Sequence, residues 1–413
     1  MFMSTIRANP RGWLIVGVIF VALSFSFAAR MSLPVLIPGW GEEFGWSREF
    51  LSSGASLIMI VMGATAPFMG NLLDKFGPRY LVAGGLVISG ACYAMTSMMD
   101  SQLFFVAVFC IGAAFGYGII SLPIATATVS RQFTENRGLA VSIGNAGVGG
   151  GQMIFLPVIA MLISTLGWRD TILAYGIIVM AVGVLSLAFL DKERPPPRAD
   201  SEGVSASSSL GAKLSYLFHR PVFWLVGGAY VICGFTTAGV VKVHLIPYAA
   251  ACGFTLTEGA ASIGVLAAFD MVGVVLSGWL TDRVHRPALL GTVYLLRALT
   301  FVMLFFITDS YLVLLLFAAL FGTLDFATVP PTSGLVASHL GLNTMGFTMG
   351  LLFTGHSIGG ALGAWLGGYF FDLTGRYDWV WFIGFGLALL AAVLAWSVPE
   401  KREGTPAAEP AAA

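Results

Sequence analysis

Ionisable side chains interrupt several long apolar segments of this chain, although only 10% of its residues are Asp, Glu, Lys or Arg. They are Arg30, Lys242, His244, Asp270, Arg297, Asp325 and His356. A charged group among apolar residues is costly, so such groups mark functional sites by default. Cationic side chains bind anions, and a carboxylate in apolar surroundings can exchange a proton near neutral pH. These residue types therefore predict a site for a small organic anion and a proton.

Asp270, Arg297 and Asp325 each lie near the middle of a different apolar segment. A side chain at that depth does not easily reach water, so pairing with an opposite charge is the simplest way to offset its cost. We expect Arg297 to pair with Asp325 or with Asp270, as a structural counter-ion in preference to a substrate ligand. The two carboxylates are expected to serve in proton coupling or in this charge pair.

Arg30 lies toward one end of the first apolar segment, where it either faces a central cavity and binds a carboxylate or reaches out to the membrane surface. We favour the cavity. Lys242 and His244 are two residues apart, and residues so spaced on a helix point about 200° apart, so both cannot face the cavity. We favour His244 as the cavity residue, because it precedes Pro247 and its type titrates near neutrality. Lys242 is then expected to reach the membrane surface.

His356 is flanked by small residues in the stretch TGHSIGGALGA. It either forms a hydrogen bond with a neighbouring helix or contributes to the substrate or proton site, and we favour the second reading. Tyr117 and Asn145 are further candidates for substrate binding. Ordinary helix packing explains both of them equally well.

The chain lacks the sequence motifs of several kinds of chemistry. The chain contains no G-x-x-x-x-G-K-[ST] and no C-x-x-C, and no paired histidines at helical spacing. An ATP-driven pump and an enzyme are therefore disfavoured, and no cofactor or metal is expected. The formal net charge of zero gives no reason to expect nucleic-acid binding. A channel is disfavoured because the internal repeat with central charges, described below, suits alternating access, whereas a transporter-like sensor stays open as an alternative.

The elements that position these residues are apolar segments of about 20 residues, the length that spans a bilayer as a helix. The chain is 57% hydrophobic, with a mean hydropathy of +0.87. Numbered in chain order, spans 1 to 12 are expected at 13–37, 51–72, 80–98, 103–127, 138–163, 168–190, 222–249, 259–281, 288–307, 311–336, 347–370 and 379–398. Open sheet edges are not viable in lipid, so the expected fold is an all-α membrane protein with twelve transmembrane helices.

Basic residues gather in the loops on one side of these spans. The other side holds only Arg48, Arg169 and Arg376. Because Lys and Arg concentrate in cytoplasmic loops, both termini are expected in the cytoplasm, with the protein in the cell inner (plasma) membrane.

The longest break in hydrophobicity, 191–220, is rich in Pro, Ser and charge and is expected to be a flexible cytoplasmic linker. It separates six-helix bundles at 1–190 and 221–399, and a disordered cytoplasmic tail is expected at 400–413. The halves repeat, because LIPG and GNLLDKFG in the first correspond to LIPY and GWLTDRVH in the second. Two six-helix repeats with a site between them near the midplane are a known transporter plan.

The stretch GNLLDKFGPR, residues 70–79, resembles the loop motif of the major facilitator superfamily, between its spans 2 and 3. The resemblance implies a cytoplasmic gate in which Gly allows close approach, acidic and basic residues make charge contacts, and a second Gly permits a tight turn. The gating residues implied are Gly70, Asp74, Lys75, Gly77, Arg79, Asp282 and Arg283. In the second copy His285 replaces the turn glycine.

Within that superfamily the chain resembles the monocarboxylate transporter branch, including bacterial YcxA-like and oxalate/formate-exchanger relatives. The resemblance rests on RGW (11–13), RGLAVSIGNAG (137–147), GWR (167–169) and FDMV (269–272). Val274 stands where the branch has its span-8 arginine. Met31 stands where animal members have a span-1 lysine, with Arg30 one residue earlier.

The expected function is therefore secondary active transport of a small, monocarboxylate-like organic anion, proton-coupled and by alternating access, by a monomer. The alternative is an efflux antiporter for an amphipathic drug-like compound. Drug antiporters of the superfamily carry a Gly-Pro pair in span 5, and this chain has NAGVGGGQMIFLP there. The sequence leaves open which anion is carried, in which direction, and whether by symport or exchange.

Overall fold

The computed structural model describes residues 9–190, 204–205, 207–307 and 310–400, and within these ranges every regular element is a helix. Eleven helical stretches of the described residues are long and apolar enough to cross a membrane. The glycine-rich α20 (Met345–Thr374), whose hydropathy is reduced by glycine and His356, is the twelfth. The predicted all-α fold with two six-helix repeats is confirmed. The expected tail beyond Glu400 lies outside the described residues.

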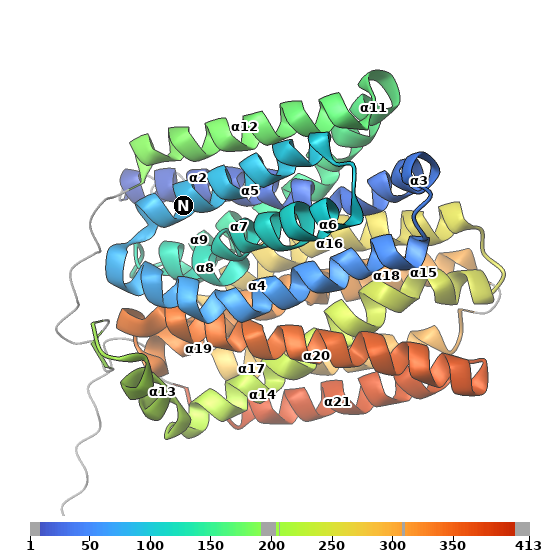
Figure 1. Cartoon of the computed structure of the whole chain (residues 1–413). Helices are drawn as coiled ribbons and strands as arrows, with labels where there is room; N and C mark the ends of the chain where they lie inside the picture. Colours follow the sequence, from blue (N-terminus) through green and yellow to red (C-terminus); the bar gives the residue numbers. More distant parts are fainter. Residues whose placement is uncertain (1–8, 191–203, 206, 308–309, 401–413) are drawn as a thin grey trace, which may run out of the picture.

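Spans 1 to 6 form the first half, drawn blue to green in Figure 1. Span 1 comprises α2 (Pro10–Met31) and α3 (Leu33–Phe44); span 2 is α4 (Arg48–Phe76); span 3 is α5 (Pro78–Met95) with η1 (Thr96–Met98); span 4 comprises α6 (Gln102–Phe104), η2 (Phe105–Ala113), α7 (Ala114–Ile119) and α8 (Leu122–Ser130); span 5 comprises α9 (Arg137–Asn145), α10 (Gly147–Gly150), η3 (Gly151–Phe155) and α11 (Leu156–Leu166); span 6 is α12 (Trp168–Phe189).

Spans 7 to 12 form the second half, drawn yellow-green to red. Span 7 comprises α14 (Pro221–Gly234), η4 (Phe235–Val241) and α15 (Lys242–Ala251); span 8 is α16 (Leu256–Thr281); span 9 is α17 (Arg286–Leu304); span 10 comprises α18 (Tyr311–Asp325), η5 (Phe326–Thr328) and α19 (Val329–Leu340); span 11 is α20, preceded by η6 (Leu342–Thr344); span 12 is α21 (Asp378–Trp396).

The expected linker is not wholly irregular, because its described part contains the short helix α13 (Leu210–Phe218). Lys213 of this helix is fully buried and donates a hydrogen bond from Nζ to Asn71 Oδ1 at 2.7 Å. Asn71 belongs to α4, so the linker is fastened to the first half. Its Pro and Ser content did not reveal this helix.

The two halves pack against each other through α4 with α20 and through α9 with α16. We call the end of the bundle at residues 70–79 and 278–286 the loop-motif end. There α4 and α20 approach so closely that a Cβ atom added to Gly70 would lie 2.0 Å from the carbonyl oxygen of Gly346. Backbones approach this closely only where small residues meet.

Asp74 joins the two halves at the loop-motif end. Its carboxylate is 0% exposed and accepts hydrogen bonds from the backbone N–H groups of Gly346 and Phe347, each at 2.9 Å. These groups belong to the first turn of α20, where backbone N–H groups have no helical partner and the helix dipole favours a negative charge. Asp74 also forms an ion pair with Arg131. The carboxylate thus caps a helix of the opposite half.

Asp282 makes the corresponding contact in the second copy of the motif. It accepts hydrogen bonds from the backbone N–H groups of Gly138, at 2.8 Å, and Leu139, at 3.0 Å, in the first turn of α9. The two carboxylates therefore cap helices reciprocally across the interface, as the internal repeat of the sequence requires.

The other motif residues contribute locally. Gly77 ends α4 with φ +79°, a value that favours glycine, and His285 has φ −64° and caps α17 by accepting a hydrogen bond from Ala288 N at 3.2 Å. The second copy therefore needs no turn glycine. Arg79, expected to contact Asp74, lies over the ring of Tyr80, and Arg283 lies over Trp279. The cation at Asp74 is Arg131, which the sequence pattern did not indicate.

Trp168 and Arg169 of the GWR stretch fasten α12 to α3 at the opposite end. Trp168 donates from Nε1 to Glu43 at 2.7 Å, and Arg169 forms an ion pair with the same carboxylate. Partial desolvation opposes ionisation of Glu43, but these two hydrogen bonds outweigh it, so the pKa of Glu43 lies below its ordinary value.

Asp74→Asn tests the reciprocal caps. The amide keeps one acceptor oxygen but loses the charge that favours the helix terminus and Arg131. Hydrogen bonds to charged groups contribute about 1.5–3 kcal/mol. We expect the state closed at the loop-motif end to be destabilised, so turnover should fall about tenfold or more while equilibrium substrate binding changes much less. Transport rates in proteoliposomes and binding to the purified protein measure the two effects.

The matched control is Asp170→Asn, which removes an exposed carboxylate at the opposite end of the bundle and should leave turnover unchanged. Asp282→Asn should reproduce the effect of Asp74→Asn. An equal loss of equilibrium binding and turnover in Asp74→Asn would show that the carboxylate acts on the substrate site instead.

Candidate functional site

Span 10 is broken near the middle of the bundle, where η5 separates α18 from α19. Pro330 and Pro331 have no N–H, so the carbonyl groups four residues earlier, those of Phe326 and Ala327, lose their helical partners. Ala327 O instead accepts a hydrogen bond from the buried Ser277 Oγ of α16. Irregular backbone at membrane depth is tolerated where other protein groups satisfy it or where it lines a cavity.

Two charged side chains bind the backbone of this break. Arg297, which is 0% exposed, donates from Nη2 to the carbonyl oxygens of Leu324, at 2.5 Å, and Asp325, at 2.8 Å. Asp270 accepts a hydrogen bond from Phe326 N at 3.0 Å. We expected Arg297 to pair with the carboxylate of Asp325 or Asp270, but its guanidinium binds the main-chain carbonyls next to the break. Arg297 and Asp270 therefore hold the broken turn in shape.

The carboxylate of Asp325 pairs with Lys242, whose Nζ lies 2.6 Å from Oδ2. The Lys242 ammonium also lies 4.6 Å from the centre of the Phe326 ring. The Lys242 side chain is 36% exposed, whereas that of Asp325 is 2% exposed. The expectation that Lys242 reaches the membrane surface is wrong: it turns inward and lies over the break in span 10.

The His244 side chain lies on the other side of span 7, against α20. Its Nε2 lies 3.0 Å from Ala364 O of α20, and its ring is 5.4 Å from that of Tyr377. The two residues do point to different sides of the helix, as their spacing predicts. It is Lys242 that lies with the other charged groups, and His244 that packs between helices.

Arg30 faces the space between the halves from α2. Its guanidinium lies 4.2 Å from the centre of the Phe27 ring, and Nη1 contacts Met62 Sδ at 3.3 Å. The charge of Arg30 interacts with Tyr117 and with Lys242 of the opposite half. The buried hydroxyl of Tyr117 has no hydrogen-bond partner among the described residues. No carboxylate of the described residues lies within 4.0 Å of the Arg30 guanidinium.

His356 lies between the rings of Tyr230, at 5.1 Å, and Phe353, at 5.8 Å. It shares a hydrogen bond with the thiol of Cys233, which also receives one from Arg297 Nη1 at 3.1 Å. His356 is thus connected to the break in span 10 through the thiol of Cys233.

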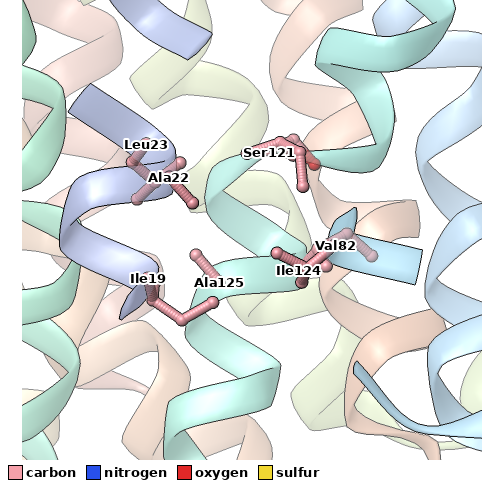
Figure 2. A pocket seen from close by; sticks show the side chains of 8 residues that line it. Ile19, Ala22, Leu23, Val82, Ser121, Ile124 and Ala125 are labelled. Atoms are coloured by element: carbon pink, nitrogen blue, oxygen red, sulfur yellow. The ribbon is translucent and has the colours of Figure 1, made fainter. Parts of the chain in front are cut away.

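Asn145 lies apart from these groups, inside the first half. It donates from Nδ2 to Thr126 Oγ1 at 2.9 Å. A small cavity within the same half lies between α2, α5 and the start of α8 (Figure 2). Its lining residues are Ile19, Ala22, Leu23, Val82, Ile120, Ser121, Ile124 and Ala125, none of them charged. An anion would find no counter-charge in this cavity.

The charges at the centre of the bundle nearly balance. Lys242 and Arg297 supply two positive charges near the break, and Asp270 and Asp325 supply two negative ones. Arg30, on the other half, has no such carboxylate among the described residues. The space between the halves therefore carries an excess positive charge, bordered by one exposed ammonium. This arrangement can bind a small anion from both halves at once.

Comparison with known proteins agrees with this architecture. The model of the Major Facilitator Superfamily matches residues 18–364 and 271–413. The chain is 26% identical over 377 residues to the uncharacterized MFS-type transporter YcxA of Bacillus subtilis (strain 168), covering 90% of this chain and 91% of that relative. It is also 26% identical over 377 residues to monocarboxylate transporter 11 of Homo sapiens, covering 89% of this chain and 78% of the relative.

Solved structures show the same fold. The human organic anion transporter MFSD10 superimposes with a TM-score of 0.76 at 16% identity, covering 93% of this chain and 99% of that one. The transporter FucP superimposes with a TM-score of 0.73 at 18% identity, covering 93% and 98%. The chain therefore belongs to the major facilitator superfamily and is a multi-pass membrane carrier, not an enzyme, with monocarboxylate transporters among its relatives.

Proposed function

We propose that this carrier is a secondary active transporter that moves a small, monocarboxylate-like organic anion together with a proton by alternating access. One observation carries the proposal: Arg30, without a carboxylate partner among the described residues, faces the Lys242–Asp325 ion pair of the other half. An anion held between them contacts both repeats, so binding is coupled to their relative movement. Relatives that are monocarboxylate transporters support the same substrate class.

The arrangement also accounts for proton coupling. Asp270 and Asp325 lie close enough for their charges to repel each other, in a bundle centre from which water is largely excluded. Two nearby carboxylates do not readily stay ionised together once a cation is withdrawn. An entering anion withdraws a cation from the carboxylates, because it competes with them for contact with Lys242. Entry of an anion and binding of a proton are therefore mutually favourable.

The excess of basic residues in the loops at the loop-motif end supports the proposal that this end and both termini lie in the cytoplasm, with the protein in the cell inner (plasma) membrane. A single chain supplies both halves of the site, so the protein acts as a monomer. An efflux antiporter for an amphipathic drug-like compound is the competing function. The excess positive charge between the halves favours an anionic cargo over it.

Arg30→Ala should weaken binding of a monocarboxylate. A charge-assisted hydrogen bond is worth roughly 1.5–3 kcal/mol, which corresponds to a loss of about 10- to 150-fold in affinity. Arg30→Lys should recover part of the loss, because the charge is kept while the planar fork is not. Calorimetric titration of the purified protein with a panel of monocarboxylates measures the change.

His356→Ala tests the second-half side of the site in the same titration. We expect a smaller loss of affinity, because His356 acts on the break in span 10 through Cys233. His244→Gln is the matched control and should bind like the wild type, since His244 packs against Ala364. Wild-type affinity in Arg30→Ala would place the anion site elsewhere and favour the efflux function.

Replacing both carboxylates, in the variant Asp270→Asn/Asp325→Asn, should abolish accumulation driven by a pH gradient while leaving anion exchange partly intact. Without either carboxylate the carrier has no group at the break to bind the proton. Uptake and counterflow of a labelled monocarboxylate in proteoliposomes separate the two activities. The control is Asp378→Asn, an acidic residue paired with Arg376 beyond the centre of the bundle. Full pH-driven accumulation by the double variant would contradict the proposed coupling.

A further inference from the structure

Asp270 and Asp325 look alike in sequence, but they are held in different ways. Asp270 is anchored by the backbone, since Oδ1 accepts a hydrogen bond from Phe326 N at 3.0 Å. Asp325 Oδ2 lies 2.6 Å from Lys242 Nζ, and no backbone N–H among the described residues donates to this oxygen. The Asp325 carboxylate is therefore held by a side-chain ion pair. A contact of this kind can be exchanged without disturbing the backbone of the broken turn.

Lys242 and Asp325 also differ in access. The lysine side chain is 36% exposed and interacts with the charge of Arg30, whereas the Asp325 side chain is 2% exposed. An anion can therefore reach the Lys242 ammonium more readily than the buried Asp325 carboxylate. Of the two cations at the break, Arg297 is bound to backbone carbonyls, so Lys242 is the one that an anion can contact without displacing backbone hydrogen bonds.

We propose that the carboxylate of the substrate replaces Asp325 at Lys242, and that Asp325, once displaced, takes the proton. This inference rests on the proposed function and assigns its coupling to one exchangeable ion pair. In the step, the contact between Lys242 and Asp325 breaks, a contact between Lys242 and the substrate carboxylate forms, and a proton from water binds the Asp325 carboxylate. The added charges sum to zero, so one anion is carried with one proton.

Withdrawal of Lys242 changes the balance of charge around the Asp325 carboxylate. The titratable or charged groups facing it are Lys242 of α15, Asp270 of α16, Arg297 of α17 and Tyr230 of α14, with Arg30 of α2 beyond Lys242. Lys242 is the cation that the substrate withdraws. Arg297 remains bound to the carbonyl oxygens of Leu324 and Asp325. An ionised Asp325 would then be left beside Asp270 with no ammonium to balance it.

Asp270 is, by the same geometry, a positioning residue. Its oxygen fixes Phe326 N and thereby the turn that holds Asp325. Asparagine can supply the same acceptor oxygen without a charge. Asp270→Asn should therefore keep proton uptake, even if the altered charge balance slows transport. Asp325→Asn should lose proton uptake while still allowing an anion to bind at Lys242.

The test is the number of protons taken up when an anion binds. Lactate is added to the purified full-length protein in weakly buffered detergent solution, a pH dye records proton uptake, and calorimetry records binding. The wild type and Asp270→Asn should take up about one proton per bound anion, and Asp325→Asn should take up none. Asp325→Glu should restore uptake because it restores the carboxylate.

One further variant keeps the result decisive. Asp325→Asn leaves Lys242 unpaired, and if it folds poorly, Lys242→Gln/Asp325→Asn removes both charges together. That double variant should bind lactate more weakly and take up no proton. Uptake retained by Asp325→Asn or by the double variant, or lost in Asp270→Asn, would overturn the assignment to Asp325 but leave anion transport intact. A wild type that binds no monocarboxylate of the panel would overturn the proposed function itself.

Discussion

Two adjacent prolines in span 10 remove two backbone hydrogen bonds in the middle of the bundle, and most of the central charged residues are arranged around that loss. Buried backbone groups must find partners. Ser277 binds one carbonyl, Arg297 binds two others near the break, and Asp270 binds the N–H of Phe326. Because the backbone takes up Arg297 and Asp270, the carboxylate of Asp325 is left for Lys242. Which charged groups a substrate can contact follows from this division between backbone-bound side chains and the Lys242–Asp325 pair.

The central break is mechanically connected to the loop-motif end through continuous helices. Span 8 carries Asp270 at the break and is followed by Asp282, which caps α9 of the other half. Helix α20 begins with the backbone N–H groups that Asp74 caps and carries His356 near the centre. A movement of either helix therefore changes the site and a cap together. Carboxylates that cap helix N-termini suit such a switch. They hold the two halves together without large apolar surfaces, and when the halves separate, water can solvate the charged groups.

The sequence was sufficient for the fold, the repeat and the two loop-motif carboxylates at the interface of the halves, because apolar length, basic loops and a loop motif are local signals. It was not sufficient to predict which side chains contact one another. Span 7 contains η4, a segment of wider helical turns that shifts the phase of everything after it, so helical spacing separated Lys242 from His244 but could not say which faced inward. Arg297 was assigned to a carboxylate because the backbone carbonyls that it binds, those of Leu324 and Asp325, leave no charge signal in the sequence. Arg131 and Lys213 gained their partners only through tertiary contact.

Positive charge between two halves that move against each other is the centre of this account, and flux of different cargoes measures it most directly. Proteoliposomes containing the purified protein are given an inward proton gradient and labelled monocarboxylates, dicarboxylates or an amphipathic cation, with the membrane potential clamped at different values. We expect monocarboxylates to accumulate in proportion to the pH gradient and independently of the potential, because one negative charge moves with one proton. Extrusion of the amphipathic cation, with no gradient-driven accumulation of any carboxylate, would contradict the account.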